Sequence, residues 1–363
     1  MQQIPRWADV VLTPILSLLT AFLISGGVIL AIGGDPIEAI KVMVDGALGS
    51  SAGWGYTLYY TTSFIFTGLA VTVAYHAAQF NIGGEGQAQL GGLGVALVCL
   101  ALPWPHWTIA LLAATTGAAL FGAAWAAIPA FLQARFGSHI VITTIMFNYV
   151  AASLLVFFLS GMLRPKGSGD PASARFPEGA KLPNLHDVPF LGALFDARTP
   201  ANVSLFIAIA ACFGVWLLLF RSRLGYEIRA FGKSESAAIY AGISPTKIIM
   251  VSMLISGALA GMMAINNVMG ESERLVLNAS EGAGFIGIAV ALMGRNHPIG
   301  VAIAALLFGF LYQGGAELGL WTTIPIELRI VIQGLVILFT GALDGMMRML
   351  VGRVFGLVRR AKA

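Results

Sequence analysis

The chain alternates between long apolar runs and short polar segments. No Asp, Glu, Lys or Arg occurs from Val10 to Gly34, from Gly46 to Tyr75 or from Gly86 to Ala134. A helix needs about 20 consecutive, mainly apolar residues to cross a bilayer, so each run can hold at least one span. We therefore predict about ten transmembrane helices. They are expected over residues 10–34, 55–77, the two halves of 86–134, 140–163, 201–220, 248–270, 282–294, 298–316 and 324–347.

The run from Gly86 to Ala134 is interrupted by Pro103-Trp104-Pro105-His106-Trp107. Prolines break helices, and tryptophans are enriched where a membrane meets water. The third and fourth spans should therefore form a hairpin. Before them, Asp35–Ser50 carries apolar residues at helical spacing beside charged ones, which is typical of an amphipathic helix lying on the membrane surface.

Two longer polar segments follow the fifth and sixth spans. Residues 164–200 are rich in Pro, Gly and charges without sustained periodicity, so they are expected to form an extramembrane loop. Residues 221–247, called the connector below, contain five basic residues and two glutamates. Within the connector, Ser234 can cap a short helix that has Glu235 in its first turn and ends at Gly242. The alternative is an ordinary solvated loop.

Composition places the chain in the membrane. It is 58% hydrophobic and only 10% charged, with a mean hydropathy of +0.84, so a water-soluble form would lack a solvated surface. The 44 glycines allow close helix packing, and Gly257-Ala258-Leu259-Ala260-Gly261 and Gly315-Ala316-Glu317-Leu318-Gly319 have the required spacing. In a glycine-rich chain that spacing can also arise by chance. The two cysteines lie inside apolar spans and have no metal-binding spacing.

The net charge of +4 is explained by topology rather than by a nucleic-acid partner. With ten spans, the connector, the Arg135 and Arg295 turns and the basic C-terminal tail all fall on one side of the membrane, as the positive-inside rule requires. Both termini are then expected in the cytoplasm and the 164–200 loop outside. Spans two to five and seven to ten would form two inverted four-helix units, an arrangement that places a substrate near the midplane.

One polar segment lies between spans two and three. Phe80-Asn81-Ile82-Gly83-Gly84-Glu85-Gly86-Gln87 joins a carboxylate and two amides to three glycines. A carboxylate at membrane depth costs about 2.5 to 3.5 kcal/mol on insertion scales, so this segment indicates a binding site or pathway. Alternatively, Glu85 lies at a helix end and reaches the headgroups. The sequence allows either a broken or a continuous helix here.

No G-x-x-x-x-G-K-[ST] motif occurs, so a transporter of this sequence either uses an ion gradient or depends on a separate ATPase. Four stretches decide between these hypotheses. The Phe80–Gln87 segment, Val141–Tyr149, Gly225–Gly242 and Gly284–Gly300 resemble, in order and spacing, the membrane permeases of bacterial ABC importers for nucleosides and simple sugars. The resemblance is closest to the nucleoside branch.

This resemblance implies an all-α, type II ABC importer-like permease that forms a single transmembrane domain over residues 1–363 of a bacterial inner-membrane protein. It also implies a cytosolic ABC ATPase, a second permease subunit, more often a different chain than a copy, and an extracytoplasmic substrate-binding protein. The chain would carry no catalytic residue, metal or cofactor. The residues expected to couple it to the ATPase are Gly225, Arg229, Gly232, Glu235 and Gly242.

Transport would proceed by alternating access. The polar residues expected along the substrate pathway are Asn81, Glu85, Gln87, Asn148, Tyr149, Asn266, Asn267 and Glu281. For each of them, hydrogen bonding between helices is the alternative role. The same machinery could carry a sugar or a branched-chain amino acid, and a different class, an ion-coupled transporter, would use Glu85 as a proton acceptor. An intramembrane hydrolase is disfavoured because Ser138-His139 lies in a turn and no G-x-S-x-G elbow occurs.

Overall fold

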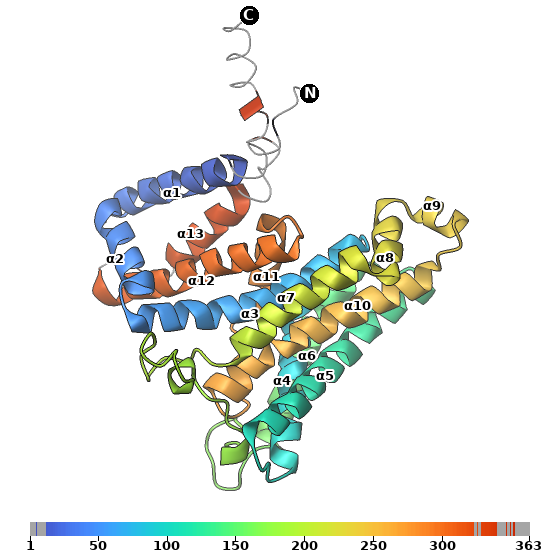
Figure 1. Ribbon diagram of the computed structural model, residues 1–363, viewed down its shortest axis with the longest axis horizontal. Helices are drawn as coiled ribbons and strands as arrows, with labels where there is room; N and C mark the ends of the chain where they lie inside the picture. The colour runs from blue at the N-terminus through green and yellow to red at the C-terminus, as the bar shows by residue number, and fades with distance from the viewer. Residues whose placement is uncertain are drawn as a thin grey trace, which may run out of the picture. The chain divides into compact units, whose positions relative to one another are not determined.

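The computed structural model describes residues 12–322 and 328–339, together with residues 5, 325, 346, 349, 351 and 352. Within these residues all regular structure is helical, apart from two isolated β-bridges. The chain divides into two compact units, which are shown in Figure 1. The terminal unit comprises Met1–Gly53 and Phe310–Ala363, and the central unit comprises Trp54–Gly309.

The helices follow the predicted apolar runs closely. In chain order they are α1 (Thr13–Ala31), α2 (Pro36–Leu48), α3 (Ser51–His76), α4 (Gly84–Ala101), α5 (Trp107–Phe136), α6 (Ile140–Ser160), η2 (Glu178–Ala180), η3 (Leu185–Asp187), α7 (Ser204–Arg221), α8 (Arg223–Lys233), α9 (Glu235–Tyr240), α10 (Pro245–Met262), η4 (Ile265–Glu271), α11 (Ala283–Met293), α12 (Pro298–Trp321) and α13 (Leu328–Ile337).

Among the described residues, seven helices are long and apolar enough to cross a membrane: α1, α3, α5, α6, α7, the α10–η4 rod and α12. Two expected spans correspond to α4, whose 18 residues include the polar Glu85, Gln87 and Gln89, and to the shorter helix α11. The tenth, expected over residues 324–347, is described only in part, and the basic tail lies outside the described residues apart from isolated positions. The count of ten therefore stays a prediction.

The amphipathic helix predicted over residues 35–50 is α2. Asp35 caps it by accepting a hydrogen bond from the Ile37 backbone N–H at 2.8 Å, and Pro36 occupies the first turn. Ile37 and Ile40, which share the predicted apolar face, are exposed in this chain, whereas Met43 is buried. An exposed apolar face on a short charged helix is the arrangement that suits a membrane surface.

Glycines bring three helices of the central unit into backbone contact. A Cβ on Gly122 of α5 would lie 2.2 Å from the Gly257 carbonyl oxygen of α10, and one on Gly91 of α4 would lie 2.4 Å from the Gly261 carbonyl oxygen. Small residues permit such approach between helices in lipid. The close packing predicted for Gly257–Gly261 is therefore confirmed, and it fixes α4 against α5 and α10.

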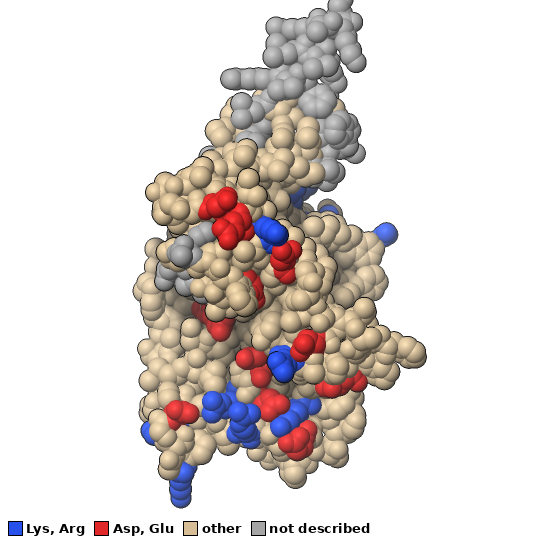
Figure 2. Space-filling view, turned by 90° about the vertical axis from the view of Figure 1, so that its left-hand side faces the viewer, with Lys and Arg blue, Asp and Glu red and all other residues tan. Residues whose placement is uncertain are grey.

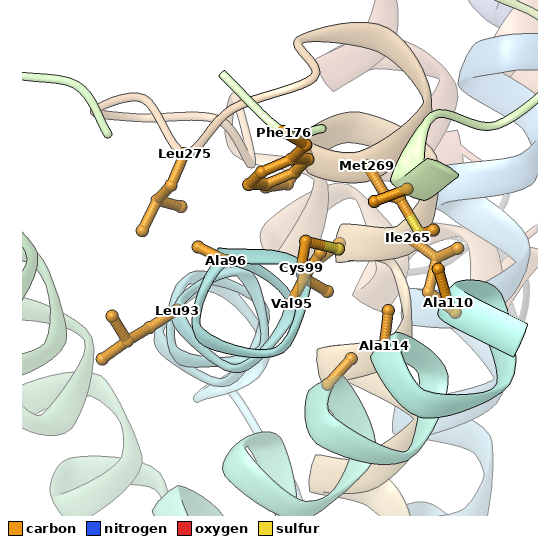
Figure 3. Packing of buried hydrophobic residues seen from close by; sticks show 14 of the residues in the cluster. Leu93, Val95, Ala96, Cys99, Ala110, Ala114, Phe176, Ile265, Met269 and Leu275 are labelled. Atoms are coloured by element: carbon orange, nitrogen blue, oxygen red, sulfur yellow. The ribbon is translucent and has the colours of Figure 1, made fainter. Parts of the chain in front are cut away.

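A hydrophobic cluster fills the space around α4. Figure 3 shows side chains of α4 and α5 packed together with Ile265 and Met269 of the π-helical turn η4. Phe176 of the 164–200 loop and Leu275 belong to the same cluster. The cluster therefore joins membrane-spanning helices to two segments that connect them.

The 164–200 segment is a loop, as predicted, with only two single-turn 3₁₀ helices in it. It is attached to residues 273–276 by backbone hydrogen bonds, from Ser173 N–H to the Leu275 carbonyl at 2.9 Å and from Phe176 N–H to the Glu273 carbonyl at 2.8 Å. Lys181 forms ion pairs with Glu178 and Glu273, and the hydrogen bond that it donates to Glu178 is the main reason that the pKa of Lys181 is raised.

Charges of both signs are mixed on the surface. On the face drawn in Figure 2, Lys and Arg side chains lie among Asp and Glu side chains rather than forming a continuous basic patch. Arg175, for example, pairs with Glu273 at 3.4 Å. A nucleic acid is usually bound by a continuous basic surface, so this face offers no such site.

Candidate functional site

The Phe80–Gln87 segment is broken rather than continuous helix. Helix α3 ends at His76, residues 77–83 are irregular, and α4 begins at Gly84. Glu85 and Gln87 therefore lie in the first turn of α4, and Asn81 lies in the irregular part. Irregular backbone at membrane depth must have its polar groups paired within the protein or face a water-filled cavity.

Two amides pair within this segment. The Asn81 Nδ2 donates to Gln87 Oε1 at 2.9 Å and to Ser256 Oγ of α10 at 2.8 Å. The Asn81 Oδ1 accepts from Gln87 Nε2 at 3.1 Å and from the Gly83 backbone N–H at 2.9 Å. Both side chains are buried. The pair closes the irregular turn onto the start of α4 and leaves little of either amide for a substrate.

Glu85 is a buried carboxylate held by another helix's N-terminus. One oxygen accepts hydrogen bonds from the Ser280 hydroxyl and from the Gly282 backbone N–H at 3.1 Å. The other accepts from the Gly284 backbone N–H at 2.9 Å, in the first turn of α11. The positive end of the helix dipole and three donors stabilise the charge, and no Lys or Arg of the described residues pairs with it.

Only glycine fits where α11 approaches α4. A Cβ on Gly284 would lie 2.2 Å from the Glu85 backbone nitrogen and 2.5 Å from its Cα. The start of α11 is thus pressed against the start of α4, which explains why the N–H groups of residues 282 and 284 both reach the Glu85 carboxylate. The broken segment and the beginning of α11 form one hydrogen-bonded structure.

Asn148 of α6 connects the two sides of the break. Its Nδ2 donates to the Ile82 carbonyl at 3.0 Å, and its Oδ1 accepts from the Gly86 backbone N–H at 2.9 Å. Asn148 follows the first residue of α6, Ile140, by eight positions, or about 12 Å along the helix axis. Because α6 has 21 residues, this contact lies well inside the span rather than at its end.

Asn266 lies in the π-helical turn η4 and is fully buried. Its Nδ2 donates to the Tyr59 carbonyl and to Ser63 Oγ of α3, both at 2.9 Å. Its Oδ1 accepts from Asn202 Nδ2 and from Ser204 Oγ, both at 3.0 Å. All four positions of the amide are used, so Asn266 joins α3 to the start of α7 through α10–η4. π-Turns commonly place side chains in this way.

Replacing Asn266 should weaken the fold. We expect Asn266→Leu to lower the free energy of unfolding by about 2–4 kcal/mol, because it leaves several buried polar groups without partners. The measurement is the thermal unfolding midpoint of the purified protein in detergent. Gln133→Leu is the control, since it also replaces an amide by Leu, at a site where Oε1 has no partner. Equal midpoints for the two variants would contradict the role assigned to Asn266.

Asn267 and Glu281 occupy different surroundings. Asn267 accepts from Ser63 Oγ at 2.9 Å and donates to the Ala279 carbonyl at 2.8 Å, so it ties the segment before α11 to η4. It also borders a small cavity, described below. Glu281 is exposed and has a positive φ of 46°, in the turn that leads into α11.

A lateral groove lies beside the broken segment. Its volume is about 390 Å³, within the range of about 300–1,000 Å³ that is usual for small-ligand sites. Helices α4, α6 and α11 supply most of its walls. The lining residues are Ile82, Glu85, Gln89, Ile145, Asn148, Tyr149, Ala152, Asn278, Gly282 and Phe285.

The groove brings together three of the predicted pathway residues, Glu85, Asn148 and Tyr149. The lining does not include the others, which are Asn81, Gln87, Asn266, Asn267 and Glu281. The lining residues that were not predicted include Gln89, Asn278 and Phe285. For Gln89 a signal existed, because it follows Glu85 by four positions, and residues at that spacing share one face of a helix.

The connector contains two helices. Ser234 caps α9 by accepting from the Ala237 backbone N–H, and Gly242 has φ +81° just after the helix, so the predicted short helix is confirmed. The preceding helix, α8, was not predicted. Near the tip of α9, the side chains of Ile239 and Tyr240 are 51% and 97% exposed. In Figure 1, α8 and α9 lie at the opposite end of the long helices from the 164–200 loop.

The predicted coupling residues separate into two groups. Gly225, Arg229 and Gly232 of α8 contact the spans: a Cβ on Gly232 would lie 2.1 Å from the His76 carbonyl oxygen of α3, and the Arg229 guanidinium lies 5.3 Å from the centre of the Phe220 ring. By contrast, Glu235 and Gly242 are exposed at the two ends of α9. The connector therefore has one face toward the spans and one free face.

Comparisons with known proteins agree with this architecture. Residues 54–341 match the family described as "Branched-chain amino acid transport system / permease component". The glucose ABC transporter permease protein TsgB13 of Haloferax volcanii is 33% identical over 94% of this chain and 90% of that protein. Two guanosine ABC transporter permease proteins of Bacillus subtilis also match: NupP, 34% identical over 91% of this chain and 93% of its own length, and NupQ, 30% identical over 74% and 84%.

Proposed function

The chain belongs to the family of branched-chain amino acid transport system permease components, and from this membership we propose that it moves a neutral nucleoside inward through an ATP-driven importer. As a multi-pass membrane permease, it is a transport component and not an enzyme. The observation that carries the proposal is the lateral groove, because it presents polar side chains well inside a span and is large enough for a small solute.

The groove should face a second subunit. Tyr149 and Phe285 are 69% and 48% exposed, and the groove between them contains the amide of Asn278 and the carboxylate of Glu85. Polar groups at membrane depth do not face lipid, but they can line a water-filled path enclosed by protein. We therefore place the substrate path between this groove and a second permease subunit, and alternating access opens it to one side of the membrane at a time.

A different permease chain is favoured as the partner. Bacillus subtilis has two guanosine ABC transporter permease proteins, NupP and NupQ, that both match this chain. Two distinct permeases named for one substrate are what a heterodimer requires. The groove would then be only half of the substrate site, and the partner would supply the other half.

The lining of the groove favours a nucleoside. It contains two aromatic rings, from Tyr149 and Phe285, and no Lys or Arg. Aromatic side chains stack on nucleobases, whereas phosphate groups are usually bound by basic side chains. A neutral nucleoside suits such a lining better than a nucleotide. A sugar is the second candidate, because TsgB13 of Haloferax volcanii is named a glucose permease and is similarly related to this chain.

Coupling to ATP is assigned to the free face of the connector. We place residues 221–247 and both termini in the cytoplasm and the 164–200 loop outside, where it can contact a substrate-binding protein. The exposed side chains of Ile239 and Tyr240 on a short, capped helix suit insertion into a cleft of the ATPase. Glu227 of α8 accepts a hydrogen bond from the Lys247 ammonium of α10 at 3.2 Å, which holds the two helices together. This hydrogen bond is the main reason that the pKa of Glu227 is lowered.

Co-purification tests this function. The chain, tagged and expressed in its native membrane, should elute with a P-loop ATPase and a second permease. We expect Tyr240→Asp to reduce the recovered ATPase at least about tenfold, since a charge would be buried at the proposed contact. Phe190→Asp is the matched control, because Phe190 is equally exposed but lies in the 164–200 loop. Elution without an ATPase, combined with uptake that survives ATP depletion and stops with an uncoupler, would identify an ion-coupled transporter instead.

A further inference from the structure

We propose that Gln89 is the residue with which this permease recognises the nucleobase of its substrate, and that it does so by accepting a hydrogen bond from an amino group on the base. This inference rests on the proposed nucleoside transport. It assigns a role to a residue that none of the sequence motifs includes. Gln89 lies on α4, one helical turn beyond Glu85 and on the same face.

The first observation is an unpaired acceptor. The Gln89 Oε1 is shielded from the surface and has no hydrogen-bond partner among the described residues, so a solute in the groove would meet it once the side chain turns toward the groove. Buried polar atoms in native proteins nearly always have a partner, and each exception calls for an explanation, such as a functional role. A few other side chains among the described residues also have unpaired buried atoms, but none of these lines the lateral groove. The unpaired acceptor and the groove coincide at Gln89 alone.

Two neighbouring polar groups of the groove, those of Asn148 and Glu85, are already occupied. Both ends of the Asn148 amide bond to backbone groups of the Phe80–Gln87 segment. The Glu85 carboxylate accepts from Ser280 and from two backbone N–H groups. These side chains build the wall of the groove and use their hydrogen-bonding capacity in doing so. Gln89 is the buried acceptor left for a ligand.

The second observation concerns the space around Gln89. This residue lines the lateral groove and also a second cavity of about 10 Å³, which Asn267 and Ser280 border as well. The second cavity has room for about one water molecule. Its small size means that a solute can approach Gln89 only from the groove.

The groove also indicates which part of the substrate carries the hydrogen-bond donor for Gln89. Tyr149 and Phe285 line it together with Gln89, so a flat ring that contacts the aromatic side chains brings its edge near an amide. A nucleobase is such a ring, and its exocyclic amino group is a donor on that edge. The geometry therefore favours recognition of the base over recognition of the ribose, whose hydroxyls are not part of a flat aromatic ring.

Competition between matched nucleosides tests the proposal in the complete transporter, reconstituted with its ATPase and partner permease. Adenosine and purine riboside differ by one amino group, as do guanosine and inosine. We expect the wild type to take up the amino-bearing member of at least one pair with at least about tenfold lower half-saturating concentration. Gln89→Leu should remove that preference by raising the half-saturating concentration of the amino-bearing nucleoside to that of its partner. Gln133→Leu, which alters an amide outside the groove, should keep the preference.

Three results would overturn the proposal. If the wild type takes up no nucleoside, the proposed function and this inference fail together. If it takes up nucleosides and Gln89→Leu keeps the full preference for the amino group, only the role of Gln89 fails. If Gln89→Leu instead changes the preference between ribosides and their 2′-deoxy analogues, Gln89 recognises the sugar and not the base. Thermal unfolding of each variant shows whether a lost rate reflects a lost fold.

Discussion

Glu85→Gln is expected to lower uptake by at least about tenfold without preventing assembly with the ATPase. The Glu85 carboxylate accepts from Ser280, Gly282 and Gly284, and an amide can place only one oxygen among these three donors. Its NH₂ group would face an N–H group, and a buried donor without an acceptor costs about 1–3 kcal/mol. The substitution also removes the negative charge that stabilises the N-terminus of α11.

The expected consequence is that the start of α11 separates from α4 and the lateral groove loses one wall. The measurement is ATP-dependent uptake in vesicles, with the amount of co-purified ATPase determined in parallel. Glu178→Gln is the matched control, because the same change is made at an exposed carboxylate of the 164–200 loop. Uptake at the wild-type rate would show that the carboxylate does not organise the groove. If Glu85→Gln loses net uptake but still exchanges substrate across the membrane without a need for protons, proton coupling is favoured instead.

Most of the fold could be predicted from the sequence because apolar runs and helix signals are local. The Pro103–Trp107 interruption marked the α4–α5 hairpin, and Ser234 marked the cap of α9. Helix α8 was missed because only Ser234 was interpreted as a helix cap within the connector. Its own cap, Ser222, which accepts from Gly225 N–H at 2.9 Å, was visible in the sequence.

The site was harder to predict, because hydrogen-bond partners far apart in the sequence decide it. The residue types of Glu85 and Asn148 indicated polar roles, but neither the pairing of Glu85 with α11 nor the span of Asn148 across the broken segment follows from spacing. Asn266 has partners on α3 more than 200 positions away, so its structural role was indistinguishable from a pathway role. Only Gln89 followed a local rule, its helical spacing from Glu85.

The connector also shows that local signals could be predicted from the sequence whereas distant contacts could not. Gly232 was expected to belong to the surface that meets the ATPase, but its Cα faces the backbone of α3. The sequence did not indicate that Gly232 lies against α3. The connector thus has two structurally different parts: α9 presents a free face, and α8 contacts residues 76–78, just ahead of the Phe80–Gln87 segment.

Gly232→Ala should therefore uncouple transport from ATP hydrolysis without releasing the ATPase. A Cβ at this position would lie 2.1 Å from the His76 carbonyl oxygen and 3.1 Å from the Ala78 nitrogen, so α8 must move away from the end of α3. The exposed side chains of α9 are unaltered by the change. We expect co-purified ATPase to stay within about twofold of wild type, whereas uptake per ATP hydrolysed falls by at least about tenfold.

Gly214→Ala provides the control for this experiment, because a Cβ on Gly214 of α7 would meet no atom within 4 Å. If Gly232→Ala loses as much co-purified ATPase as is expected for Tyr240→Asp, then Gly232 belongs to the surface that binds the ATPase. Wild-type uptake per ATP would show instead that the contact between α8 and α3 transmits nothing. The expected combination, an ATPase that stays bound and an uptake that fails, would support transmission of connector movement to the Phe80–Gln87 segment through residues 76–78.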